Sequence, residues 1–230
     1  MKRVLILLPL LLVSLILKAQ SDVYWRLYPK VGLNLSKFPN DHFYHFYVGG
    51  VMTDYELKSR YKQGLTAGVE LSFEKGAGSA TLGLMYANRG TKYGDYTYED
   101  ASEQEKVSGI QYTLHYLEMP LMGGIEVARG LKLKAGIQPG FLLKANFMYS
   151  SIVSEKQENG VMTVVEVNDS NTDVGDTFKK VALAIPVGLS YEFSNVVIDA
   201  RYVIGLNDSS EYIKGRHSGF TFTVGYGFDL

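Results

Sequence analysis

Five charged residues, Glu70, Arg89, Glu118, Asp199 and Arg201, each lie within a stretch in which apolar residues alternate with small or polar ones. Charges of both signs on one face of a set of strands could form a constriction that selects ions. They could equally neutralise one another in a narrow interior, because an unpaired buried charge costs several kcal/mol. We favour the second interpretation and predict a structural charge network inside the protein. A narrow pore for ions or small solutes is the alternative.

The alternation that positions these charges is clearest between Lys180 and Asp208. Every second residue from Val181 to Phe193 is large and apolar, and the residues between them are small or polar. Ser194 and Asn195 then supply a turn, after which the alternation resumes with Asp199 and Arg201 on the polar face. Because side chains alternate across a strand, this pattern predicts a hairpin with one apolar face and one polar face.

The same alternation recurs along the chain and predicts eight strands, near residues 28–38, 63–74, 79–93, 110–127, 131–149, 181–193, 196–208 and 217–230. The phase changes within 110–127, so we expect a bulge near Tyr116 and Leu117. Long and short connections alternate along the chain, which is typical of barrels with short turns at one end and long loops at the other. We therefore predict an all-β protein, an eight-stranded antiparallel up-and-down transmembrane β-barrel.

The solvent of each face decides between a membrane barrel and a soluble one. A soluble, lipocalin-like barrel would direct its apolar face inward and its polar face outward. Here the polar face mixes charges with glycine, alanine and serine, which suits a narrow interior, and the apolar face is nearly without charge. A basic residue facing lipid at the bilayer midplane costs about 2–4 kcal/mol. The apolar face is therefore expected to contact outer-membrane lipid.

Export is predicted by the first residues. Lys2 and Arg3 precede an apolar run from Val4 to Leu17, and Ala19 ends a plausible cleavage site. We expect residues 1–19 to be a signal peptide and residues 20–230 to be the barrel domain, located in the cell outer membrane. The chain has no cysteine, which excludes a disulfide framework, and its formal net charge of −1 does not favour nucleic-acid binding.

Four segments of the predicted strands carry sequence motifs. They are Pro29 to Ser36, Gly83 to Tyr86 with Arg89-Gly90, the YLE-x-P-L pattern of Tyr116 to Leu121, and the D-x-R-Y pattern of Asp199 to Tyr202. With these motifs the chain resembles the outer-membrane β-barrel family of Bacteroidota, often labelled porin-family or PorT-like. The similarity spans nearly the whole mature chain. It implies the barrel fold and the outer-membrane location, but most members of the family have no defined activity.

Enzymatic chemistry is weakly supported. An outer-membrane lipid-modifying enzyme would need an activated serine, or a histidine with a carboxylate partner. His115 and Glu118 are the one pair of this kind that is close in sequence, and a girdle or interior histidine explains His115 more simply. The pair His42 and His45 is a weak metal signature. We therefore predict no catalytic residues, no metal and no cofactor.

The long connections are the remaining candidates for function. They are rich in tyrosine and in acidic residues, a composition that suits recognition surfaces. Tyr44, Tyr47, Tyr96 and Tyr98 are the recognition candidates. We predict a non-enzymatic outer-membrane barrel with a structural, surface-binding or assembly role exerted through long extracellular loops. Besides lipid, the expected partner is an extracellular ligand or another envelope protein.

Overall fold

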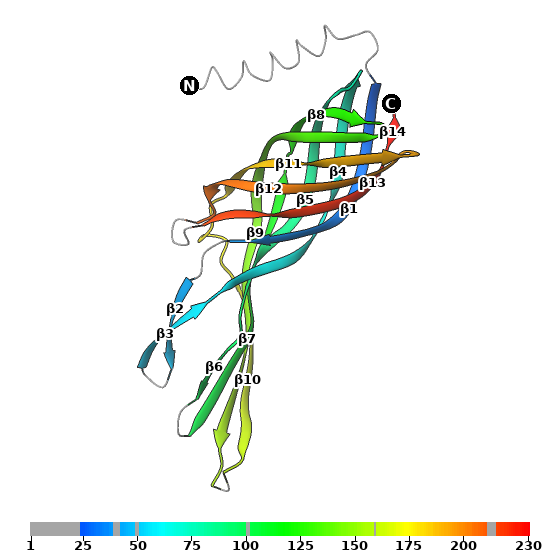
Figure 1. The fold of residues 1–230 in the computed structure, drawn as a ribbon. Helices are drawn as coiled ribbons and strands as arrows, with labels where there is room; N and C mark the ends of the chain where they lie inside the picture. The colour runs from blue at the N-terminus through cyan, green and yellow to red at the C-terminus, as the bar shows by residue number, and fades with distance from the viewer. Residues whose placement is uncertain (1–23, 39–41, 49–50, 100–101, 159, 211–214) are drawn as a thin grey trace, which may run out of the picture.

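The computed structural model describes residues 24–38, 42–48, 51–99, 102–158, 160–210 and 215–230 (Figure 1). Side chains are considered in 24–38 and from Leu57 onward. The predicted signal peptide lies outside the described residues. Antiparallel strands make up most of the described chain, and none of its helices is long and apolar enough to cross a membrane.

The strands close into a barrel with eight positions around the ring, as the alternation predicts. Neighbours along the chain pair with one another, and the ring closes where the first strand pairs with the penultimate one. In order around the ring these are β1 (Tyr24–Lys37), β4 (Ser59–Lys75), β5 (Gly78–Tyr93), β7 (Glu103–Glu118) with β8 (Leu121–Ala128), β9 (Leu131–Lys156), β11 (Val181–Phe193), β12 (Val196–Asp208) and β13 (Arg216–Tyr226). β14 (Phe228–Asp229) pairs with the start of β1.

β7 and β8 together occupy one position of the ring. The two strands are separated by Met119 and Pro120, but the ladder continues across the gap. The amide of Met119 donates to the carbonyl of Pro139 at 2.8 Å, and the amide of Gly83 donates to the carbonyl of Pro120 at 2.8 Å. A proline without an amide hydrogen is thereby accommodated in the middle of the sheet.

The barrel has an apolar exterior and a polar interior, as predicted for a membrane barrel. In β12, Ile198, Tyr202 and Ile204 are exposed on the outer face, whereas Asp199 and Arg201 are buried on the inner face. The same division holds in β1, where Val31 and Leu33 are exposed, whereas Lys30 and Asn34 are buried on the inner face. A soluble barrel would show the opposite division.

The predicted short turns lie together at one end of the barrel, beside the C-terminus (Figure 1). Ser194 and Asn195 both have positive φ angles, 48° and 68°, between β11 and β12. Two such residues in succession match a two-residue hairpin turn whose twist agrees with the flanking strands. Gly76 and Gly130 have positive φ angles at the other two short turns. In barrels of this kind the short turns face the periplasm.

The long connections are built from strands, which corrects the prediction that they are loops. β7 and β9 continue past the barrel and, with β6 (Tyr96–Glu99) and β10 (Met162–Asp173), form a projecting four-stranded sheet, the finger (Figure 1). β9 has 26 residues, more than twice the roughly 9–11 that a tilted strand needs to cross a bilayer. β2 (His42–Val48) and β3 (Val51–Leu57) form a separate hairpin. The polar composition of these segments concealed their strand pairing.

Candidate functional site

A buried cluster of ion pairs fills the middle of the barrel, formed by Lys30, Glu70, Lys134, Asp199 and Arg201. The carboxylate of Glu70 accepts two hydrogen bonds from Arg201, at 2.5 and 2.9 Å. Lys30 donates to Glu70 at 2.6 Å and also to Asp199. The Nζ atom of Lys134 lies 4.0 Å from the second oxygen of Asp199. None of the five side chains is more than 7% exposed, so each charge depends on its neighbours for compensation.

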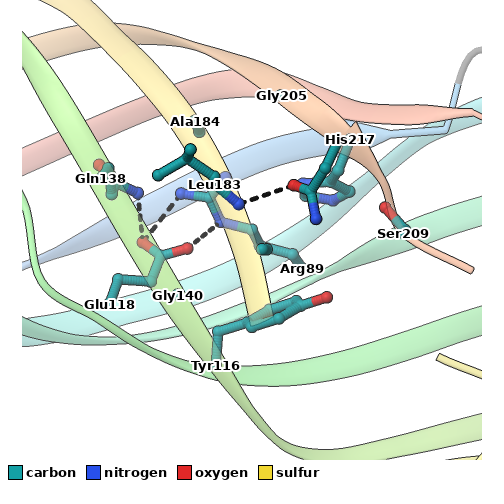
Figure 2. A pocket seen from close by; sticks show the side chains of 12 residues that line it. Arg89, Tyr116, Glu118, Gln138, Gly140, Leu183, Ala184, Gly205, Ser209 and His217 are labelled. Atoms are coloured by element: carbon teal, nitrogen blue, oxygen red, sulfur yellow. Dashed lines mark hydrogen bonds and ion pairs between the residues drawn. The ribbon is translucent and has the colours of Figure 1, made fainter. Parts of the chain in front are cut away.

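A second buried pair lies closer to the finger (Figure 2). The Nε atom of Arg89 is 2.6 Å from Oε1 of Glu118, and its Nη2 donates to Oε2 at 2.9 Å. Gln138 donates to the same Oε2 atom at 2.8 Å. Beside this group is a cavity of about 20 Å³, close to the space that one water molecule needs, which His217 also lines. The described side chains therefore leave little free space at this level.

Further ion pairs close the opposite, short-turn end of the barrel. Lys132 donates to Glu74 at 2.5 Å. Arg26 pairs with Glu192 and, at 2.7 Å, with Asp229 near the C-terminus. These side chains come from β1, β4, β9, β11 and β14. Their ion pairs therefore connect strands on different sides of the ring at the short-turn end.

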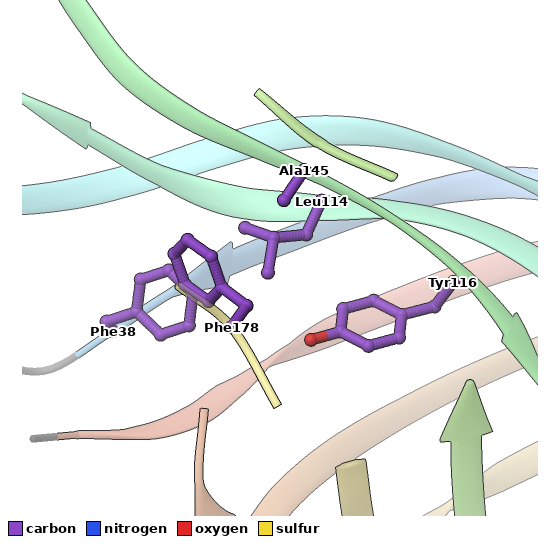
Figure 3. Packing of buried hydrophobic residues seen from close by; sticks show 5 residues of the cluster. All are labelled: Phe38, Leu114, Tyr116, Ala145 and Phe178. Atoms are coloured by element: carbon purple, nitrogen blue, oxygen red, sulfur yellow. The ribbon is translucent and has the colours of Figure 1, made fainter. Parts of the chain in front are cut away.

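An apolar cluster, the stopper, closes the end of the interior that faces the finger. Its buried members are Phe38, Leu114, Tyr116, Ala145 and Phe178 (Figure 3). The Phe38 and Phe178 rings stack with their centroids 6.0 Å apart. Phe178 and Tyr116 are each 3% exposed. The stopper and the charge clusters thus place buried side chains at successive levels of the barrel interior.

The segment that carries Phe178 is held inward by hydrogen bonds to the barrel. The hydroxyl of Ser210 donates to the carbonyl of Thr177 at 2.6 Å, and the amide of Lys179 donates to the carbonyl of Ser209 at 2.9 Å. On the other side, the amide of Leu142 donates to the carbonyl of Lys180 at 2.8 Å. The connection between β10 and β11 therefore folds back into the barrel.

A register shift lies between His115 and Tyr116, at the expected position, but the bulge predicted within 110–127 is wrong because β7 keeps its phase there. The additional residue lies on the partner strand, because His115 pairs with Lys144 and Tyr116 pairs with Leu142, which leaves Leu143 unmatched. The bulge inverts the facing of β9 beyond this point, so that Ala145 turns inward. Leu114 and Tyr116 face the interior in β7. The apparent phase change within 110–127 arises because these two large apolar residues belong to the stopper and do not face lipid.

The structure divides the five predicted network residues into two groups. Glu70, Asp199 and Arg201 lie in the central cluster, and Arg89 and Glu118 form the separate second pair. Lys30 and Lys134, which complete the central cluster, were missed as members of the network. The signal for Lys30 was present in the sequence, because Lys30 has the same inward phase as Gly32 and Asn34 in β1.

The base of the finger has an apolar core of its own. Leu57, Tyr93, Tyr96, Val107 and Ile110 are buried there, and Tyr112, Phe147 and Tyr149 pack against them. Tyr96 is 9% exposed, so its ring supports the finger and does not fit the recognition role predicted for it. Tyr98, two residues further on, is half-buried. The side chains of Tyr44 and Tyr47 lie outside the described residues.

The suspected histidine–carboxylate pair does not form. His115 is on the outer side of β7, where its Nδ1 atom lies 2.5 Å from the hydroxyl of Tyr86. Glu118 faces the interior and pairs with Arg89. Since residues three apart in a strand point to opposite faces, the two groups cannot share a proton. No metal-ligand cluster occurs among the described residues.

Comparisons with known proteins agree with this architecture. A family model described as "Outer membrane protein beta-barrel domain" matches residues 18–211. A search of curated proteins found no match. Among solved structures, Neisserial surface protein A is similar with 11% identity and a TM-score of 0.44, covering 89% of this chain and 97% of that one.

A second similar structure is Ail, the attachment invasion locus protein of Yersinia pestis, in complex with the heparin analogue sucrose octasulfate. Its identity is 13% and its TM-score 0.38, over 90% of this chain and 99% of that one. The family match covers most of the chain. It includes the whole finger and every barrel strand that precedes β13. The chain belongs to the outer membrane protein beta-barrel domain family and is located in the outer membrane.

Proposed function

We propose that this protein is a non-enzymatic surface-binding or assembly barrel, in which a sealed barrel anchors the finger for contact with an extracellular ligand or another envelope protein. The observation that carries the proposal is the finger itself, a four-stranded sheet with its own apolar core, standing beyond a filled interior. A pore would instead need an open interior. Tyr98, Tyr44 and Tyr47 remain recognition candidates within this proposal.

The motifs of the first, third, fourth and seventh predicted strands support placing the chain among the porin-family, PorT-like barrels of Bacteroidota. In the same proposal, residues 1–19 are a cleaved export signal and 20–230 the mature barrel. Mass spectrometry of the protein purified from outer membranes tests the boundary, because cleavage after Ala19 makes Gln20 the first residue.

Because buried side chains occupy the interior, we predict that the purified barrel does not conduct ions. Wild-type protein in planar bilayers is expected to give no steady single-channel current. Replacing Phe178 by Ala opens the stopper but leaves the Arg89–Glu118 pair and the central cluster in place. We therefore expect this variant to remain closed as well. Large, steady currents from the wild type would overturn the sealed-barrel proposal in favour of the narrow pore.

Shortening the finger tests its role. Ser151 and Asn168 are cross-strand partners and form a hydrogen-bonded pair by the alternation of the ladder, so a two-residue Asn-Gly turn can join them directly and remove residues 152–167. The barrel strands stay intact, and we expect the protein to keep the altered gel mobility that folded barrels show before heating. Crosslinking on intact cells is expected to lose the wild-type adducts.

The matched control is Gln157→Asn, an exposed position between β9 and β10, which keeps the full length of the finger and leaves β10 unchanged. Its crosslinked adducts should equal those of the wild type. The surface-binding proposal fails if the shortened barrel folds, reaches the outer membrane and retains every adduct.

A further inference from the structure

β10 forms one edge of the finger and has an open side. It pairs with β9 and with no other strand of the described chain. All of its side chains are exposed except Ser170, which is half-buried. A strand in this position presents a row of unpaired backbone groups that another extended chain can pair with.

The hydrogen-bond pattern identifies which backbone groups face outward. The amide of Val174 donates to the carbonyl of Ala145 at 2.9 Å, which makes these residues a hydrogen-bonded pair. Bonded and non-bonded pairs alternate along an antiparallel ladder. Counting back from Val174 through the unbroken register to Glu166, the amides and carbonyls of Val167, Asp169 and Asn171 point away from β9. The free edge therefore has a regular set of donors and acceptors.

The edge lacks two of the features that often protect an exposed strand, proline and lysine. β10 contains no proline and no lysine, and its single register shift lies between Val164 and Glu166. Val164 and Val167 are 57% and 61% exposed, although they lie in the finger and away from the lipid-facing band. Exposed apolar side chains on an open edge favour association with another strand.

The charge of β10 indicates the chemistry of the strand that would pair with its open edge. It carries Glu166, Asp169 and Asp173 and has no basic residue. Their described partners are neutral: Glu166 accepts from Asn168 at 2.7 Å, and Asp169 accepts from the hydroxyl of Ser150 at 2.5 Å. None of the three acidic groups forms an ion pair within the described part of the chain. A second copy of β10 would bring acidic residues to an acidic edge, whereas a basic strand would complement it.

We propose that the open edge of β10 accepts an extended segment of another protein, in which apolar residues alternate with lysine or arginine, by antiparallel or parallel strand addition. The backbone groups of Val167, Asp169 and Asn171 supply the hydrogen bonds, and the acidic side chains select basic residues. This inference rests on the proposed surface-binding function and names the chemistry of its partner.

A synthetic peptide of about nine residues, long enough for one strand, with alternating valine and lysine and a fluorescent label, provides the probe. Its binding to the full-length barrel in detergent micelles is measured by anisotropy. Val167→Pro removes an outward amide at a position where an edge strand tolerates proline. We expect it to weaken binding at least tenfold, while the control Val167→Thr, which keeps the amide, stays within about threefold. A peptide with glutamate in place of lysine should not bind.

Three results would overturn the edge inference. They are no binding of the lysine peptide to wild-type protein, equal binding to the folded Val167→Pro variant, and a concentration-dependent dimer of the wild type that this proline abolishes. The crosslinking experiment with the shortened finger distinguishes failure of the edge inference from failure of the proposed surface-binding function. If crosslinked adducts depend on the finger but not on the amide of Val167, the surface-binding function stands and the partner contacts another part of the finger.

Discussion

Replacing Glu70 by Gln is expected to destabilise the folded barrel by about 3–5 kcal/mol, the usual cost of removing one partner from a buried ion pair. The side chain of Glu70 is fully buried, and its carboxylate compensates both Lys30 and Arg201. After the substitution, Asp199 alone would face three basic side chains. Urea unfolding in lipid vesicles, followed by the loss of the compact gel band, measures the change.

Two variants separate charge from packing. Adding Lys30→Met to Glu70→Gln removes one positive charge and returns the central cluster to its original net charge, so we expect part of the stability to recover. Glu74→Gln is the matched control at the periplasmic mouth, where the side chain is 20% exposed and pairs with Lys132. It should cost clearly less than Glu70→Gln, because this pair is only partly buried and water at the mouth can compensate the remaining charge. Equal losses at Glu70 and Glu74 would contradict a structural role for the central cluster.

The barrel could be predicted because its physical requirements repeat along the chain. Lipid on one side and a packed polar interior on the other impose the same alternation on each strand, and the β11–β12 hairpin displays it without interruption. The finger could not be predicted in the same way. The outer parts of β7, β9 and β10 are solvated, so their stability comes from pairing between distant segments and leaves no apolar period in the sequence.

The interior was predictable in composition but not in arrangement. The inward phase identified Glu70, Asp199 and Arg201 as neighbours, but the pairing of Glu118 with Arg89 depends on the stagger of β5 against β7. Leu114 and Tyr116 were misleading, because their large apolar side chains suggested the lipid face when they in fact form the stopper. The unmatched residue Leu143 is invisible in the sequence of β9 alone, since a bulge is a property of two strands.

The second large effect is expected at Gly32, where replacement by Val should prevent the barrel from closing. A Cβ atom at this position would lie 1.9 Å from the carbonyl oxygen of Phe222 and 2.7 Å from the Cα atom of Thr223. Both atoms belong to the backbone of β13, with which β1 closes the ring, so no side-chain rotation can relieve the contact. We expect a loss of more than about 4 kcal/mol, seen as failure to form the compact gel band on refolding into vesicles.

Gly123→Val is the matched control, because a Cβ atom at Gly123 meets nothing within 4 Å and the residue is exposed on the outer face of β8. Valine suits a lipid-facing strand, so this variant should fold as well as the wild type. If Gly32→Val also folded, β1 and β13 would have to separate, and the interior would widen beside Lys30. Such a barrel should conduct in planar bilayers. The close approach at Gly32 therefore lets β1 and β13 pair tightly enough to keep the interior narrow beside the central cluster.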